Sequence, residues 1–327
     1  MIEEITTSLY RVEVPLPHNP LKTLNSYFIK GRDRNLIIDT GMNLPECREA
    51  LLSAMAKLEI DLNRTDFFIT HFHVDHVALA PYLATRNTKI YLNQKEAEML
   101  NNPLSWETYR SFYLAHGLSE NEWQTMEQHH MTQSYQDGQL QIDFVGLAEN
   151  DVLQIADYSF RCIATPGHSP GHLCLYEPDK KILISGDHVL FDITPNITSW
   201  PSLENALREY LINLDKVYPL DVTLVLPGHR RIESNHRRRI LELKEHHRAR
   251  AAEILTALGK DAKTAYQIAP LVTWDISCSS WDQFPTPQKF FALGEVIAHL
   301  KYLEGEGTLR SQWQNGQVVF FNPSISG

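Results

Sequence analysis

A short cluster of side chains that can bind metal ions lies near position 70 of the chain. In order, it contains His71, His73, Asp75 and His76. Imidazole and carboxylate groups are typical zinc ligands, and this spacing allows four side chains to converge on a small volume. The cluster directly follows an apolar segment, which makes ordinary surface histidines or a helix cap a weak alternative. The pattern therefore predicts a metal site of the kind that hydrolyses a substrate.

Three more polar residues follow glycines at the ends of predicted strands. They are His168, Asp187 and His229, in the segments Thr-Pro-Gly-His, Ser-Gly-Asp-His and Leu-Pro-Gly-His. A glycine before a polar residue lets the backbone turn sharply and approach a bound ion. One Gly-His pair alone is weak, but three such segments in this order indicate further ligands of the same site.

Short apolar segments separated by turns must position these residues. Helical spacing appears at 46–58 and again at 203–217, where Ser202 is the predicted N-cap. Alternating or continuous apolar runs predict strands. The predicted strands are 10–14, 26–29, 35–38, 66–69, 89–92, 151–155, 159–164, 172–177, 181–184 and 222–226. The mixture predicts an α/β fold in which each candidate ligand follows a strand.

Two regions differ from this body of the chain. The stretch from about 94 to 136 has helical periodicity and is predicted to be a helical insertion over a cleft. From 236 onward, three predicted helices are followed by an Asn315-Gly316 hairpin turn. Three helices and a hairpin resemble a winged-helix domain. We therefore expect a catalytic domain at 1–235 and a winged-helix-like domain at 236–327.

Composition limits the classes of partner and compartment. With 30 Lys and Arg against 40 Asp and Glu, the formal net charge of −10 disfavours a nucleic-acid partner, although RNA stays open. No run approaches the roughly 20 apolar residues of a membrane helix, and the start Met-Ile-Glu-Glu does not resemble a signal peptide. The four cysteines form no Cys-x-x-Cys pair and are read as buried thiols. We expect a cytoplasmic protein with no membrane partner.

Taken in order, the seven candidate ligands resemble those of the metallo-β-lactamase-fold hydrolases, over roughly residues 10–229. The resemblance implies an αββα sandwich. For one metal ion it implies the ligands His71, His73 and His168. For the other it implies Asp75, His76 and His229, with Asp187 bridging the two ions.

Three residues near the ligands are candidates for supporting roles. Asp39 follows an apolar strand at a position that in this superfamily lies under the metal site, although a turn-forming role is equally consistent. His172 belongs to a Gly-His-x-x-Gly-His element that resembles glyoxalase II-like enzymes, and we expect it to orient a ligand. His188, beside Asp187, is expected either to contact substrate or to face outward.

The expected cofactor is a pair of divalent ions, with zinc favoured and iron or manganese possible. Two ions that share a carboxylate and a bridging water lower the pKa of that water to about 7 and so generate hydroxide at neutral pH. No serine or cysteine nucleophile is then required. Asp75 and Asp187 are the catalytic candidates that would relay a proton to the leaving group.

The substrate is the least determined property. A metallo-β-lactamase body with a winged-helix tail resembles the β-lactamase-like 2 group and glyoxalase II-like hydrolases. We favour a small ester-like substrate such as a thioester, with aromatic residues of the insertion either lining an acyl pocket or packing in a core. These aromatics are Trp106, Tyr109, Phe112, Tyr113 and Trp123.

Two other activities stay open. One is an endoribonuclease or phosphodiesterase that contacts phosphates through basic residues between 237 and 250, although interleaved glutamates also fit a solvated linker helix. The other is a sulfur dioxygenase with a single iron held by residues such as His71, His73, His168 or Asp187. The tail could also support a homodimer.

Overall fold

The computed structural model describes residues 1–133, 143–276, 278 and 280–323. The chain divides into two compact units. The first unit comprises Met1–Pro103, Leu140–Pro195 and Ile212–Leu241, and the second comprises Leu104–Gln139, Asn196–Leu211 and Glu242–Gly327. This division differs from the predicted single boundary at 235/236, because most of the insertion packs with the C-terminal helices. The predicted end of the insertion, near 136, lies outside the described residues.

The first unit contains a sheet of seven strands in sequence order. They are β1 (Ile2–Thr6), β2 (Leu9–Pro15), β3 (Thr23–Ile29), β4 (Asn35–Ile38), β5 (Thr65–Phe68), β6 (Ile90–Asn93) and β7 (Phe144–Leu147). The strands from β1 to β4 pair antiparallel, and those from β4 to β7 pair parallel. Parallel pairing requires crossovers, and the one between β4 and β5 contains α1 (Pro45–Lys57).

A second sheet of the same unit has the order β12-β11-β10-β9-β8. Its strands are β8 (Val152–Ile155), β9 (Tyr158–Ala164), β10 (Leu173–Glu177), β11 (Ile182–Gly186) and β12 (Leu224–Pro227). Only β11 and β12 pair in parallel among these described strands; the others are antiparallel. The loops after β9, β11 and β12 carry candidate ligands.

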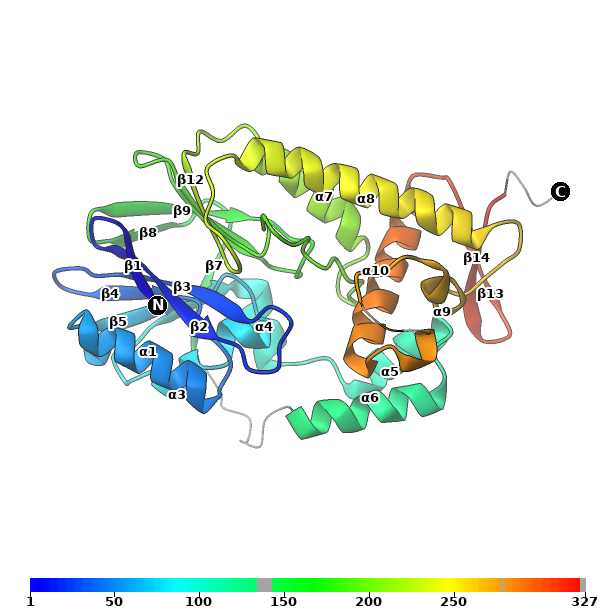
Figure 1. Cartoon of the computed structure of the whole chain (residues 1–327), viewed down its shortest axis with the longest axis horizontal. Coiled ribbons are helices and arrows are strands. Elements are labelled where there is room, and N and C mark those ends of the chain that lie inside the picture. The colour runs from blue at the N-terminus through cyan, green and yellow to red at the C-terminus, as the bar shows by residue number, and fades with distance from the viewer. Residues whose placement is uncertain (134–142, 277, 279, 324–327) are drawn as a thin grey trace. The chain divides into compact units, whose positions relative to one another are not determined.

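Apolar side chains join these layers. One buried cluster lies between the sheets and includes Phe68 and Ile38 from the first and Phe160 and Leu175 from the second. Another covers the outer face of the first sheet, where α1 contributes Leu51 and other side chains, and Figure 1 shows α1 beside β2. Sheets whose two faces are both covered explain why β4 and β5 are buried along their whole length. The first unit thus has the predicted α/β fold, with two sheets packed face to face and helices over the first sheet.

The second unit is mainly helical. It contains α5 (Trp106–Ala115), α6 (Glu120–Gln133), α9 (Ala265–Ile268), α10 (Thr286–Gly305) and the hairpin β13 (Arg310–Gln314) with β14 (Gln317–Phe321). The helices α7 (Ala206–Val217) and α8 (His236–Leu258) each divide between the two units. Asn315 and Gly316 both have positive φ, at 51° and 78°, as the predicted hairpin turn requires. A winged-helix assignment for this unit stays a prediction.

The aromatic residues of the insertion belong to the core of this second unit. Trp123 is 1% exposed, and Tyr109, Phe112 and Tyr113 pack against the cluster that α10 dominates. Tyr113 and Phe290 of α10 meet edge to face, with ring centroids 4.9 Å apart. The packing supports the core alternative for these four residues and not the acyl pocket.

Three smaller expectations have separate outcomes. Cys47, Cys162 and Cys174 are buried thiols, but Cys278 is exposed, so the expectation for that residue was wrong. The helix α7 begins at Ala206 and not just after Ser202, since Leu203 forms an isolated bridge with Trp200 and the residues around it form turns. Within the described residues, no helix is long and apolar enough to span a membrane.

Candidate metal centre

The strands of the first unit bring all seven candidate ligands to one site. His71 and His73 lie in the loop after β5, and Asp75 and His76 lie on the short helix α2 (Val74–Val77). His168 lies between β9 and β10. Asp187 directly follows β11, and His229 follows β12 after Gly228. Because β11 and β12 are parallel, their carboxyl ends lie at the same edge of the sheet. The geometry explains why residues distant in sequence converge.

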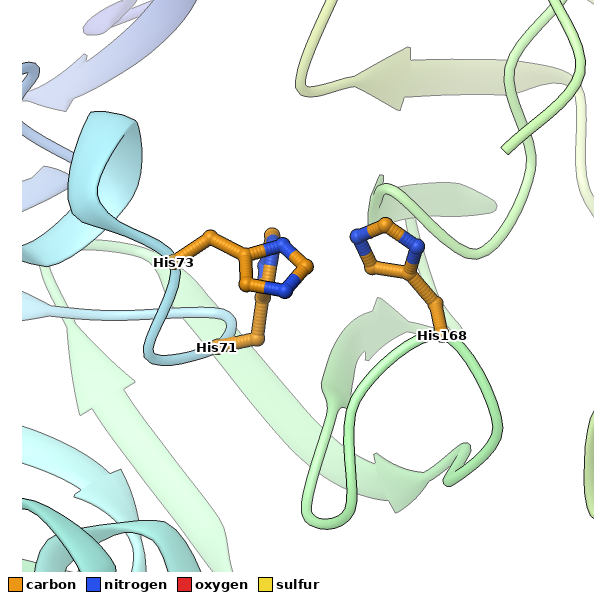
Figure 2. A group of neighbouring side chains, drawn as sticks. All are labelled: His71, His73 and His168. Carbon is orange, nitrogen blue, oxygen red and sulfur yellow. The ribbon is translucent and has the colours of Figure 1, made fainter. Parts of the chain in front are cut away.

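Three histidines form the first possible metal-binding group. Figure 2 shows the rings of His71, His73 and His168 turned toward one region, two from the loop after β5 and one from the opposite loop. The Nε2 atom of His71 lies 2.9 Å from the Nδ1 atom of His73. The ring centroid of His168 lies 4.9 Å from that of His71 and 4.6 Å from that of His73. Three imidazoles this close, from two loops, suit a shared cation.

A second group combines Asp75, His76 and His229, and a third combines His71, His76 and Asp187. Asp187 Oδ2 lies 3.7 Å from His76 Nε2 and 3.6 Å from both His168 Nε2 and His229 Nε2. These separations exceed hydrogen-bond lengths, but ligand atoms about 2.1 Å from a tetrahedral ion lie roughly 3.4 Å from one another. The ligand atoms therefore fit around cations, and Asp187 faces both groups.

The outer nitrogens of three ligand histidines have partners that fix their tautomers. His76 Nδ1 donates to Asp39 Oδ2 at 2.8 Å, and His229 Nδ1 donates to the Thr23 carbonyl at 2.8 Å. His71 Nδ1 lies 3.0 Å from the hydroxyl of Thr70. With the proton on Nδ1, the lone pair of Nε2 faces the site in each case. Among the described residues, Nε2 of His76 and of His229 has no hydrogen-bond partner, as a metal ligand requires.

Asp39 holds two parts of the ligand loop at once. Its carboxylate accepts the backbone N–H of Thr70 at 2.8 Å, the hydroxyl of Thr70 at 2.9 Å and the proton of His76 Nδ1. Its φ of 58° is a left-handed conformation that aspartate adopts more readily than most residues. These bonds support the alternative in which Asp39 orients a candidate ligand, His76, whereas no turn is assigned at Asp39 itself.

His172 and His188 occupy different surroundings from the ligands. Both ring nitrogens of His172 are engaged, since Nδ1 bonds the hydroxyl of Thr165 at 2.7 Å and Nε2 accepts the backbone N–H of Asp187 at 3.1 Å. His172 therefore orients Asp187. His188 is fully buried and does not face outward. Burial lowers the pKa of His188 to about 3, so its ring is neutral at physiological pH.

Two glycines of the strand-end segments leave room for side chains of the site. A Cβ atom at Gly228 would lie 2.5 Å from Asp187 Oδ1 and 2.9 Å from His76 Cε1. At Gly186, where φ is +48°, a Cβ atom would lie 2.6 Å from His172 Nε2. Close approach, more than the sharp turn expected from sequence, explains why a side chain cannot stand at these positions.

The ionisation states of the cluster suit cation binding. Burial lowers the pKa of His73 to about 3, and burial together with neighbouring histidines lowers the pKa of His71 well below its usual value. Burial opposes the ionisation of Asp187, but His229, His76 and His168 hold its pKa well below the usual range. Asp75 likewise has a pKa of about 2, despite its burial, because of His76 and His229. Neutral imidazoles and ionised carboxylates are the forms that bind metals.

One residue of the site was missed by sequence reasoning. Glu96 of α4 (Gln94–Asn101) is fully buried and accepts hydrogen bonds from both ligand loops. Burial raises the pKa of its carboxyl to about 7, although three donors act in the opposite direction. In the sequence, Glu96 stands in the run Gln-Lys-Glu-Ala-Glu, which has the composition of an exposed helix. No local signal distinguishes it from Glu98.

Comparison with known proteins adds a family assignment. The family described as "Metallo-beta-lactamase superfamily" matches residues 22–229. The chain is 24% identical to "Probable metallo-hydrolase YqjP" of Bacillus subtilis (strain 168), covering 96% of this chain and 98% of that protein. It is 27% identical to "Acyl-coenzyme A thioesterase MBLAC2" of Homo sapiens, covering 63% of this chain and 72% of that protein. The crystal structure of metallo-beta-lactamase family protein TTHA1429 from Thermus thermophilus aligns with a TM-score of 0.82 at 27% identity, covering 97% and 99%.

Proposed function

We propose that this chain uses two divalent metal ions, zinc by preference, to hydrolyse a small thioester. The proposal starts from what is established, namely that the chain belongs to the metallo-beta-lactamase superfamily and is a metallo-hydrolase. The observation that carries the proposal is the position of Asp187 between the two groups, within 3.7 Å of nitrogen atoms from both. In this proposal His71, His73 and His168 bind one ion, and Asp75, His76 and His229 bind the other. Asp187, which faces both groups, would help to hold both ions.

The bound ions would supply an activated water and a Lewis acid for the scissile carbonyl. The protein's own groups would do the remaining work. Asp39 and the Thr23 carbonyl keep His76 and His229 in the tautomer that faces the site. Asp75 and Asp187, ionised at neutral pH, would accept a proton from the attacking water and return it to the departing thiolate.

The thioester class rests on likeness to a relative. The human relative bears the name of an acyl-coenzyme A thioesterase and matches 63% of this chain. Two observations weigh against the other activities. A single-iron oxygenase needs only one ligand group and leaves Asp75, His76 and His229 without a role. Among the basic residues of α8, Arg237 donates to backbone carbonyls of its own unit, which makes it less suited to bind phosphates.

Three other arginines of α8 also have partners within the chain. Arg239 donates to the carbonyls of Leu190 and Ile193 within the first unit. Arg248 pairs with Glu245, and Arg250 pairs with Glu253. Intramolecular pairs of this kind reduce the positive potential that an RNA backbone would need, in a chain that already carries a net charge of −10.

The test combines metal analysis with a substrate panel. Metal-reconstituted full-length protein should contain about two equivalents of zinc per chain and should hydrolyse acyl-coenzyme A thioesters faster than lactones, phosphodiesters or single-stranded RNA. His73→Ala and Asp187→Ala should each lower turnover at least about 100-fold, as expected for lost transition-state stabilisation. Fewer than one bound ion, or wild-type turnover in both variants, would refute the proposal. Preferential cleavage of RNA would refute the substrate class alone.

A further inference from the structure

Glu96 connects the two loops that carry the three-histidine group. Its Oε2 atom accepts the backbone N–H of Phe72 at 2.7 Å, and its Oε1 atom accepts the backbone N–H of Gly171 at 2.8 Å. The hydroxyl of Ser169 also donates to Oε1. Phe72 is covalently bonded to both His71 and His73, and Ser169 directly follows His168. The donors thus lie in the immediate neighbourhood of all three histidines.

The helix that carries Glu96 is held in place by its N-cap and by the loop after His168. Glu96 lies in the first turn of α4, whose N-cap Asn93 accepts the backbone N–H of Lys95 through its side chain. The loop that follows His168 is pressed against this helix. A Cβ atom at Gly171 would lie 2.6 Å from Asn93 Oδ1 and 2.9 Å from Glu96 Cγ. Neither the helix nor the loop can shift without breaking these contacts.

The burial of the Glu96 carboxylate has a cost in free energy. Glu96 is 0% exposed, and removing a carboxylate from water costs free energy that hydrogen bonds must offset. An apolar residue on α4 would avoid the cost but would leave three donors, on two loops, without their acceptor. Those loops come from different sheets, since the first follows β5 and the second lies between β9 and β10. One carboxylate therefore joins the two sheets at the ligands.

We propose that Glu96 is a positioning residue that sets the distance between the His71–His73 pair and His168, and thereby the affinity of the three-histidine group for its ion. The inference rests on the proposed function, because it concerns one of the two metal ions named there. The hydrogen bonds of Glu96 go to two backbone N–H groups and to the Ser169 hydroxyl. Glu96 therefore positions the histidines indirectly, by holding the backbone next to them.

The chemistry of the amide defines the first variant. Glu96→Gln keeps the size of the side chain, but one carboxylate oxygen becomes an NH₂ group. If the amide oxygen stays with Ser169 and Gly171, the NH₂ faces the Phe72 N–H, and two donors oppose each other. The His71–His73 loop is then released. Ser169→Ala removes a single contact and should have a smaller effect.

Glu177 offers a matched control. It is another buried glutamate of the same unit, 2% exposed, and it accepts the backbone N–H of Lys180 at the far end of β10. Its carboxylate stabilises a hairpin turn and has no described contact with either ligand loop. Glu177→Gln therefore reports what the loss of a buried carboxylate does to the fold alone.

The experiment measures zinc affinity by competition with a chromophoric chelator, using full-length metal-free protein, and the visible absorption of the cobalt-substituted forms. Circular dichroism melting of the metal-free proteins monitors the fold. In Glu96→Gln, one of the two zinc ions should bind about 10- to 100-fold more weakly, the usual effect of removing an outer-shell partner, with an altered cobalt spectrum. Ser169→Ala should show a smaller loss, and Glu177→Gln should bind both ions as the wild type does.

Each other result has a defined meaning. Unchanged zinc affinity and an unchanged cobalt spectrum in Glu96→Gln would overturn the inference while the wild type still binds two ions. Equal losses of affinity in Glu96→Gln and Glu177→Gln, with equal losses of melting temperature, would also overturn it, because the role would then be structural. A wild-type protein that binds no ion would reject the proposed function and this inference together.

Discussion

Asp39→Asn tests whether the charge and orientation of one buried carboxylate control the metal centre. The carboxylate of Asp39 accepts three hydrogen bonds, two from Thr70 and one from His76 Nδ1. Asparagine tolerates the left-handed φ of 58° at this position, so the substitution adds little backbone strain. Any change in metal binding then comes from the altered hydrogen bonds.

The amide can adopt two orientations, and both carry a cost. If its oxygen keeps the bonds to His76 and to the Thr70 hydroxyl, its NH₂ group opposes the Thr70 N–H, which lies 2.8 Å from Oδ1. An unpaired buried donor costs about 1 to 3 kcal/mol. If the amide is reversed, its NH₂ faces His76 Nδ1 and moves the imidazole proton to Nε2. The ring then cannot bind a metal through Nε2.

We therefore expect Asp39→Asn to weaken zinc binding about 10- to 100-fold, which corresponds to about 1.4 to 2.7 kcal/mol. Chelator competition on the full-length protein measures the affinity, and urea unfolding of the metal-free protein measures stability. Asp66→Asn is the control, since Asp66 lies in β5, is 6% exposed and pairs with Arg34 away from the ligands. The reasoning is refuted if Asp39→Asn binds zinc within about threefold of the control.

Two further predictions concern packing and pH. Gly228→Ala should lower zinc content and activity, because its Cβ atom would lie 2.5 Å from Asp187 Oδ1. Gly305→Ala is the control and should keep the zinc content and activity of the wild type, because among the described atoms its Cβ would lie near Asn205 only. His116, buried in the second unit, has a pKa lowered by burial to about 4 from 6.5. The unfolded protein therefore binds this proton more readily than the folded protein. The free energy of unfolding should fall as pH falls from about 6.5 toward 4, by up to about 1.4 kcal/mol per pH unit. Urea unfolding at several pH values should show this slope in the wild type and a shallower one in His116→Gln.

The convergence of the candidate ligands could be predicted because each of them has a local sequence signal. His71 and His76 stand in one compact motif, and Asp187 and His229 each follow a glycine at a strand end. The structure gives these glycines a reason that sequence could not provide. Gly228 leaves space for Asp187 and His76, which are distant in sequence and close in the fold.

Properties that depend on packing between distant segments were not predictable in the same way. Glu96 has the sequence context of a solvated helix, yet it is buried because Phe72 and Gly171 direct their N–H groups toward it. Trp123 resembled a pocket residue as much as a core residue, and its burial follows from helices more than a hundred residues later. The division into units has the same cause, because contacts and not chain order define a compact unit.

The metal centre joins both sheets, and its polar groups also compensate one another without an ion. Burial alone would lower the pKa of His76 and of His229, yet nearby carboxylates raise both above 6.5. When they carry a second proton, His76 and His229 balance the buried charges of Asp75 and Asp187. A cation that binds here replaces those protons, so metal binding releases protons. The carboxylates are already buried before the ion binds. The sandwich can therefore fold with its ligands already assembled, and the orienting contacts of Asp39, His172 and Glu96 decide how well they receive the ion.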